Sequence, residues 1–241
     1  MRPAAVEALE RDTVAAVAPP ETLEIGDWLV PLDNGTIGRA RSAVPLSHDI
    51  EPDAIAEIEA AYRDRGLPPA FRVADVPSLA AVRDELARRG FAPEQPTIFK
   101  TGFIAELAEF SEASARILPK PDDAWAAVFL GEGFDPADGA HRIAALTRSP
   151  DAIYGAAGEG GETQGVGVMS FGAAWAGIHG MRTAPAHRGK GLAAAVLAAL
   201  GREAQLRGVE RLFLQVEEAN PARRIYRRAG LSSAWRYHYW R

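Results

Sequence analysis

Hydrophobic and polar residues alternate along the chain in two rhythms, one typical of strands and one typical of helices. In the first half, strand-like runs fall at 27–32, 36–46, 70–74 and 95–104. Apolar stripes with helical spacing fall at 3–17, 52–66 and 79–90. Asp33-Asn34-Gly35 separates the first two strand-like runs and favours a hairpin turn between them. The pattern therefore predicts a helix, a β-hairpin, a helix, a strand, a helix and a strand.

The second half begins with a predicted hairpin of its own and continues with the same alternation of helices and strands. Strand-like runs fall at 152–156, 163–171, 175–183, 211–216 and 233–240, and helical stripes fall at 191–207 and 221–229. The two halves match in order but not in sequence, which predicts a duplicated fold. The alternative is that any mixed α/β chain shows such an alternation.

Prolines mark the boundaries between the predicted parts. Pro19-Pro20 ends the first helix, and the proline- and charge-rich stretch 118–123 is typical of a linker. We therefore predict an N-terminal helix over 1–20, a first domain over 21–118 and a second domain over 122–241.

Composition narrows the functional classes. The chain has 241 residues, of which 47% are hydrophobic and 24% charged, as in ordinary globular proteins. It has no cysteine, which excludes disulfides, thiolate metal sites and a cysteine nucleophile, and we predict no metal site. The net charge of -5 does not favour nucleic acid. No apolar run reaches the roughly 20 residues that a bilayer requires, and the charged N-terminus is unlike a signal peptide. We expect a cytoplasmic protein without a membrane partner.

The stretch 175–199 carries the strongest chemical signal. It reads as an apolar strand, a glycine turn and an Ala- and Leu-rich helix. The first turn of a helix leaves N–H groups free and favours an anion. Gly189 and Gly191 allow a positive φ and let a phosphate approach the backbone, while Arg188 and Lys190 add cationic donors. This order of elements predicts a phosphate site.

The spacing of the glycine and basic residues narrows the class of phosphate ligand. Lys190 is followed by Gly191, and position 184 is alanine, so the nucleotide-triphosphatase loop is excluded. The dinucleotide pattern is excluded too, because Gly189-x-Gly191 continues to Ala194. What remains is Arg188-x-x-Gly191-x-Ala193 after a strand. It resembles the pyrophosphate signature of the GNAT superfamily of acyl-CoA-dependent N-acyltransferases.

The resemblance implies a fold and a cofactor site. The implied fold is α/β (α+β), a mixed, mostly antiparallel sheet flanked by helices, here duplicated as in tandem GNAT proteins. Acetyl-CoA is the implied co-substrate. Its pantetheine arm is expected to pair with the backbone of the strand, and its pyrophosphate to lie on the turn. The residues expected to bind it are Met181, Arg182, Thr183, Arg188, Gly189, Lys190, Gly191, Leu192 and Ala193. The matching connection in the first half, 45–52, has no glycine turn, so that half is expected to lack the cofactor and to act as a scaffold or to gate the substrate.

Residues 214–231 support the resemblance independently. In the family, an asparagine that begins a helix contacts pantetheine, and a tyrosine on that helix protonates the leaving thiolate. Asn220 and Tyr226 match these positions, and Asn220 is also a good N-cap. The family spacing is one residue longer than the six positions between them, and one residue turns a helical side chain by about 100°. Tyr226 is therefore predicted as the acid, while either the helix cap at Asn220 is rebuilt or Asn220 has lost its contact with the cofactor.

An amine acceptor must also lose a proton. His179 lies on the central strand, and strict alternation places it on one face with Met181 and Thr183. An imidazole there can accept the proton directly or through water. Glu217, after the next strand, is the competing base, and a structural histidine is the alternative for His179.

These observations predict an N-acetyltransferase in which an amine attacks acetyl-CoA directly. We expect the acceptor to be a small-molecule or peptide amine, and a homodimer is compatible with the sequence. A non-catalytic acyl-CoA sensor is the competing hypothesis, because it needs neither Tyr226 nor a base. A longer acyl group is a third hypothesis.

Overall fold

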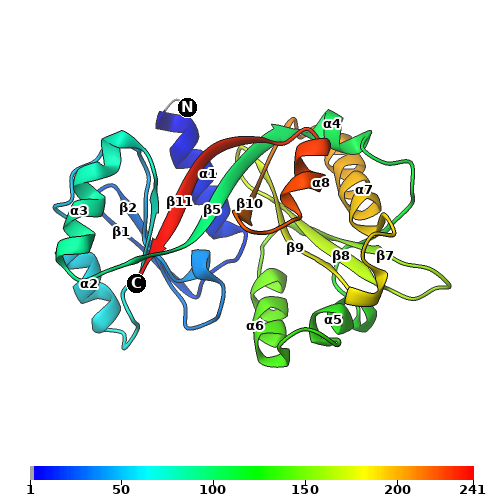
Figure 1. Ribbon diagram of the computed structural model, residues 1–241, viewed down its shortest axis with the longest axis horizontal. Coiled ribbons are helices and arrows are strands. Elements are labelled where there is room, and N and C mark those ends of the chain that lie inside the picture. Colours follow the sequence, from blue (N-terminus) through cyan, green and yellow to red (C-terminus); the bar gives the residue numbers. More distant parts are fainter. Residues whose placement is uncertain (1–2) are drawn as a thin grey trace.

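One sheet of eight strands runs through the whole molecule, as the computed structural model of residues 3–241 shows (Figure 1). In spatial order its strands are β4 (Phe71–Ala74), β11 (Ser232–Trp240), β5 (Pro93–Phe103), β10 (Arg211–Glu217), β9 (Ala176–Thr183), β8 (Gly165–Phe171), β7 (Ala152–Ala157) and β6 (Arg116–Leu118). Only the β9–β10 pair within this sheet is parallel. The predicted mixed, mostly antiparallel sheet is confirmed.

A smaller antiparallel sheet lies in the first half. It contains β1 (Glu21–Ile25), β2 (Trp28–Leu32) and β3 (Val44–Pro45). The predicted antiparallel pairing of 27–32 with 36–46 is present as β2 and β3, but the tight turn predicted at Asp33-Asn34-Gly35 was wrong. The tight turn falls earlier, between β1 and β2, where Gly26 has a φ of 54°. The segment predicted as one strand over 36–46 instead contains the short 3-10 helix η1 (Gly38–Ala40) before β3.

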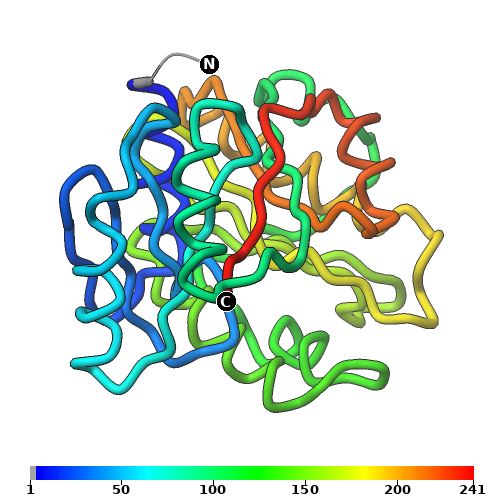
Figure 2. The backbone as a smooth tube through the Cα atoms, turned by 60° about the vertical axis from the view of Figure 1, so that its left-hand side comes forward, coloured from blue at the N-terminus to red at the C-terminus, as the bar shows by residue number. Residues whose placement is uncertain are grey.

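The two halves exchange their last strands. In the first half β3 meets β4 in parallel through an Ala43–Phe71 bridge, as β9 meets β10 in the second half. Strand β5, which ends the first half, pairs with β10, and β11, which ends the second half, pairs with β4. The exchanged strands also pair with each other and run side by side across the molecule (Figure 2). This matching topology supports a duplicated fold. The boundaries at 20, 118 and 122 stay a prediction, and the large sheet runs across the last two.

Helices cover both faces of the large sheet. They are α1 (Pro3–Ala15), α2 (Ile55–Arg63), α3 (Ala80–Arg88), α4 (Ile104–Ala108), α5 (Asp123–Leu130), α6 (Pro136–Thr147), α7 (Leu192–Leu206) and α8 (Arg223–Arg228). Two further 3-10 turns are η2 (Pro77–Leu79) and η3 (Pro185–His187). None of the helices within residues 3–241 has the length and apolar character needed to span a bilayer.

The apolar faces of the helices form separate cores. Helix α7 buries Val196, Leu197 and Leu200 against β7, β8 and β9, on the face that α4 also covers. Trp125 of α5 packs with Tyr154 of β7 in a different cluster. Trp28, Trp125, Trp175 and Trp235 are all buried.

Candidate active site

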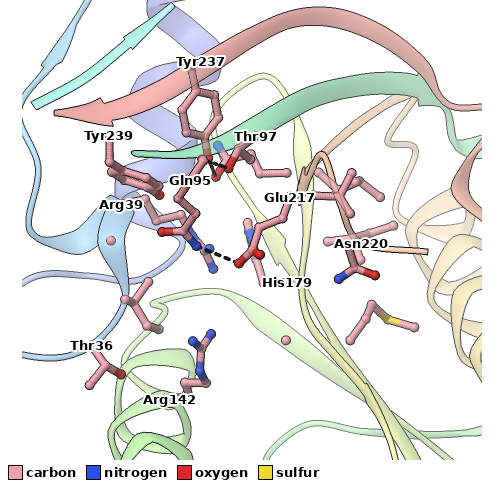
Figure 3. A pocket seen from close by; sticks show the side chains of 18 of the residues that line it. Thr36, Arg39, Gln95, Thr97, Arg142, His179, Glu217, Asn220, Tyr237 and Tyr239 are labelled. Atoms are coloured by element: carbon pink, nitrogen blue, oxygen red, sulfur yellow. Dashed lines mark hydrogen bonds between the residues drawn. The ribbon is translucent and has the colours of Figure 1, made fainter. Parts of the chain in front are cut away.

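A cavity opens where the two parallel strands of the large sheet separate. Strands β9 and β10 pair only over Ala176–Ile178 and Leu212–Leu214 within residues 3–241. Beyond that point β9 continues along β8 to Thr183, and β10 continues along β5 to Glu217. The cavity has a volume of about 300 Å³ and is lined by both diverging strands (Figure 3).

A bulge in β9 reorients its side chains beside the cavity. Gly180 has a φ of 57°, and the register of β9 on β8 shifts between Val168 and Val166. The extra residue places Met181 over Gly167 and toward α7, whereas His179 lies beside Phe213 in a different core. The prediction that His179, Met181 and Thr183 share one face was therefore wrong, because strict alternation fails across a bulge.

His179 lines the cavity but is held firmly in its wall. Its side chain is buried, and its Nε2 lies 3.0 Å from Ser170 Oγ. Burial holds the pKa of His179 well below its ordinary value, and the charge of Arg39 lowers it further. The imidazole is thus neutral at physiological pH. Its role as a base stays a prediction.

Tyr226 and Asn220 line the same cavity, although their spacing departs from the family pattern. Burial raises the pKa of Tyr226 to about 12, so its hydroxyl keeps its proton. Asn220 Oδ1 accepts a hydrogen bond of 2.9 Å from the Ala222 N–H just before α8 begins. The N-cap of α8 is Ala222, so the prediction of Asn220 as the N-cap was wrong by two residues. The bond closes a turn ahead of the helix and leaves the amide nitrogen of Asn220 as a donor.

The glycine turn has the geometry that a phosphate site requires. Gly189 and Gly191 have φ values of 80° and 81°, and a Cβ on either would meet nothing within 4 Å. Helix α7 begins at Leu192 with no side-chain cap. Lys190 and Arg188 are exposed beside the turn, while Ala193 lies in the first turn of the helix. Among the predicted cofactor residues only Met181 and Asn220 also line the cavity itself.

The first half supplies the opposite wall, in line with its expected role beside the substrate, through residues that the sequence did not single out. From η1 and the residues before it come Thr36, Ile37, Gly38 and Arg39, and from β5 come Gln95 and Thr97. Gln95 Nε2 donates a 2.7 Å hydrogen bond to Glu217 Oε1 across the two halves. Tyr237 and Tyr239 of the exchanged strand β11 complete this wall, so the cavity belongs to both halves (Figure 3).

Comparison with known proteins identifies the family. The family model described as "Probable histone acetyltransferase Rv0428c C-terminal" matches residues 3–240. The chain belongs to this acetyltransferase family. The resemblance to the GNAT superfamily is confirmed, and this acetyltransferase is a GNAT-type enzyme. Members of that superfamily use acyl-CoA in general.

Individual relatives match most of the length of the chain. "Uncharacterized N-acetyltransferase YobR" of Bacillus subtilis strain 168 is 27% identical over 222 residues, which are 89% of this chain and 90% of the relative. The solved GCN5-related N-acetyltransferase from Kribbella flavida has a TM-score of 0.73 and 15% identity, and the match covers 98% of this chain and 94% of the other. A tandem GNAT protein from the clavulanic acid biosynthesis pathway has a TM-score of 0.61 and 14% identity, with 97% and 94% covered. At these identities the two structures show a shared fold.

Proposed function

We propose that this acetyltransferase uses acetyl-CoA and transfers the acetyl group to the amine of a small acceptor by direct attack. The observation that carries the proposal is the cavity between the diverging strands β9 and β10, which Tyr226 and Glu217 line together. Strand β9 leads from this cavity into the glycine turn. The reacting end and the phosphate end of a long thioester would thus follow one strand.

The chain fits the cofactor along this path. Past Ile178, the edge of β9 that faces β10 has no strand partner within residues 3–241, so backbone groups of Met181, Arg182 and Thr183 are suited to pair with the amides of pantetheine. The open space at Gly189 and Gly191 and the uncapped start of α7 suit the pyrophosphate. Arg188 and Lys190 add positive charge there.

Acetyl-CoA supplies an activated acetyl thioester, and the residues of the chain handle protons and charge. The acceptor nitrogen forms the new bond to the acetyl carbon while the bond from that carbon to sulfur breaks. Tyr226 donates its proton to the departing sulfur, which a phenol with a high pKa can do as a neutral acid. A backbone N–H of β9 beyond Ile178 is suited to stabilise the charge that develops on the thioester oxygen.

The base that takes the amine proton is better placed at Glu217 than at His179. Glu217 is exposed in the cavity and held by Gln95, so it can reach an acceptor. His179 is buried against Phe213 and Ser170, where a positive charge is disfavoured. We therefore assign proton removal to Glu217 and a positioning role in the cavity wall to His179.

The competing hypothesis of a non-catalytic acyl-CoA sensor needs only the glycine turn and β9. A sensor has no use for a protonated phenol and a carboxylate that line the same cavity. The presence of both Tyr226 and Glu217 in the cavity wall supports catalysis.

Calorimetry with acetyl-CoA and with CoA tests the cofactor site. The Gly191→Glu variant should lose binding, because its carboxylate would repel the pyrophosphate. Gly208→Glu is the matched control, because Gly208 has a φ of 75°, has no neighbour within 4 Å of a Cβ and lies just past the other end of α7. This control should bind acetyl-CoA like the wild type at a comparable cost in stability. A wild-type protein that binds neither ligand would refute both the enzyme and the sensor.

A further inference from the structure

The cavity holds a guanidinium group that the chain leaves without a partner. Arg39 lines the cavity, and within residues 3–241 its Nε has no hydrogen-bond partner and its guanidinium makes no ion pair. Burial lowers the pKa of Arg39, Tyr239 and Tyr237 partly oppose this shift, and Arg142 and Arg72 add to it. Arg39 is half-buried, and a partly desolvated cation without a counter-charge favours an anion beside it.

The packing of η1 against β11 fixes the backbone position of Arg39. Arg39 lies in η1, where a Cβ on the neighbouring Gly38 would approach the ring of Tyr239 to 2.7 Å. Ser42 Oγ donates a 2.8 Å hydrogen bond to the Gly38 carbonyl. This turn is therefore held tightly against β11, and it directs the Arg39 side chain into the cavity (Figure 3).

A second guanidinium group is oriented toward the same space. Arg142 of α6 donates a 2.6 Å hydrogen bond from Nε to Asp138 Oδ2, which leaves its terminal nitrogens as donors. Thr36 donates a 2.7 Å hydrogen bond to the other oxygen of Asp138 and so fixes this carboxylate. Figure 3 shows Arg39 and Arg142 pointing into the cavity from opposite sides.

The only carboxylate side chain among the described residues that line this cavity is Glu217. The cavity wall thus carries guanidinium groups from η1, from α6 and from Arg241, which pairs with Glu94, and one carboxylate side chain at the end of β10. A molecule that carries both an amine and an anion would satisfy both ends. It would place its amine beside Glu217, next to the position of the thioester, and its anion at Arg39.

We propose that the acceptor is a small amino acid-like amine whose carboxylate binds to Arg39 and Arg142. This inference rests on the proposed function and names its substrate class. The planar fork of a guanidinium group matches the two oxygens of a carboxylate, which favours a carboxylate over other anions. The cavity volume of about 300 Å³ fits a compact acceptor.

Pairs of acceptors that differ only in the carboxylate test the proposal. The twenty L-amino acids and their α-amides are offered to the wild type and to Arg39→Gln, and CoA release and binding to the CoA-bound protein are measured. The wild type should prefer at least one acid over its amide by roughly 10- to 100-fold in kcat/KM, as for a charge-assisted hydrogen bond. The lower basicity of an amide's α-amine would act in the opposite direction, so it cannot produce this preference.

In Arg39→Gln, kcat/KM should fall much more for the acid than for its amide, so the preference for the acid should fall toward unity, with Arg142 left as the remaining partner of the carboxylate. Arg63→Gln is the control for loss of one positive charge, because Arg63 lies on the outer face of α2 and its side chain is 60% exposed. Melting curves of each variant report on folding. This control should keep the wild-type preference.

The outcomes separate the two proposals. Acetylation of amides as fast as of acids would overturn the carboxylate site and leave the acetyltransferase function standing. Equal losses on acid and amide in Arg39→Gln would make Arg39 structural and overturn the inference as well. Preference for O-phosphoethanolamine over every amino acid would assign the site to a phosphate instead. Binding of amino acids without any CoA release would support the site and refute the proposed transfer, whereas no binding and no release would refute the inference.

Discussion

Tyr226 shows how burial can prepare a single residue for acid catalysis. Its pKa is raised to about 12 by burial, so the hydroxyl stays protonated throughout the pH range in which amines become nucleophilic. An ordinary tyrosine would begin to lose its proton near pH ~10. The site is therefore able to keep its acid at the same pH at which its acceptor is deprotonated.

Replacing Tyr226 by phenylalanine isolates the hydroxyl. We expect Tyr226→Phe to lower kcat roughly 10²-fold, the usual contribution of a general acid, with little change in affinity for acetyl-CoA. CoA release and calorimetry measure the two quantities. Tyr62→Phe is the matched control, since Tyr62 is also buried but donates its hydrogen bond to Pro31 in the first half. Wild-type kcat in Tyr226→Phe would show that the hydroxyl takes no part in the transfer.

His179 is expected to affect stability more than rate. Its pKa in the folded protein lies below the value of the unfolded chain, so the unfolded chain binds a proton first as the pH falls. The contribution of His179 is thus complete above pH ~6.5 and is lost below it, at about 1.4 kcal/mol per pH unit until the folded protein is also protonated. Denaturant unfolding at several pH values should show that His179→Gln removes part of this acid sensitivity.

The same variant separates the two candidate bases. His179→Gln should keep kcat within a few-fold of the wild type, whereas Glu217→Gln should lower it at neutral pH and recover as rising pH deprotonates the acceptor. A large loss of kcat in His179→Gln, with a normal rate in Glu217→Gln, would return the base to His179.

At the scale of elements, helix α1 connects both halves through buried polar contacts. Glu10 forms an ion pair of 2.6 Å with Arg72 of β4, and Gln215 of β10 donates a 3.2 Å hydrogen bond to Thr13. Asp12 accepts hydrogen bonds from the backbone N–H groups of Ala173, Ala174 and Trp175 in the turn between β8 and β9. The helix thereby fixes the start of the strand that carries the candidate active site.

Removing the Asp12 carboxylate should loosen this connection. Asp12→Ala leaves three N–H groups without their acceptor, and we expect a loss of about 2–4 kcal/mol in the free energy of unfolding. Denaturant titration measures the loss. Glu7→Ala is the matched control on the same helix, because its exposed ion pair with Arg11 should contribute less than about 1 kcal/mol. Equal effects of the two substitutions would show that Asp12 does not anchor the turn.

Local sequence patterns predicted most of the helices and strands. They failed at positions where a contact between distant segments or an irregular backbone determines which way a side chain points. The apolar stripe of 191–207, together with Gly189 and Gly191 at its start, predicted α7 and its turn almost completely. No sequence pattern of this kind marks the bulge at Gly180. The face of β9 on which the His179 side chain lies was therefore predicted wrongly. Arg39 is one arginine in an irregular segment, and only the folded chain shows that it lacks a partner.

At the scale of the whole molecule, the strand exchange makes each half depend on the other. Strand β11 pairs only with β5 and β4 within residues 3–241, both from the first half. Strand β10 would keep only its short parallel contact with β9 if β5 were removed. The pairings of β10 and β11 with the strands of the first half join residues more than a hundred positions apart, so no local sequence pattern predicts them. The unit of folding is therefore expected to be the whole chain and not either predicted domain.

Separate fragments test this dependence. We expect neither 1–118 nor 119–241 to show a cooperative melting transition when expressed alone, because each would expose unpaired strand edges that promote aggregation. Expressed together, the fragments should form a stable one-to-one complex that binds acetyl-CoA, as size-exclusion chromatography and calorimetry would show. The control is the full chain cut at a protease site inserted at the exposed residues 119–120, which should stay associated and active because every strand keeps its neighbours. A lone 119–241 fragment that melts cooperatively and binds acetyl-CoA would instead show that the second half folds without the exchanged strand.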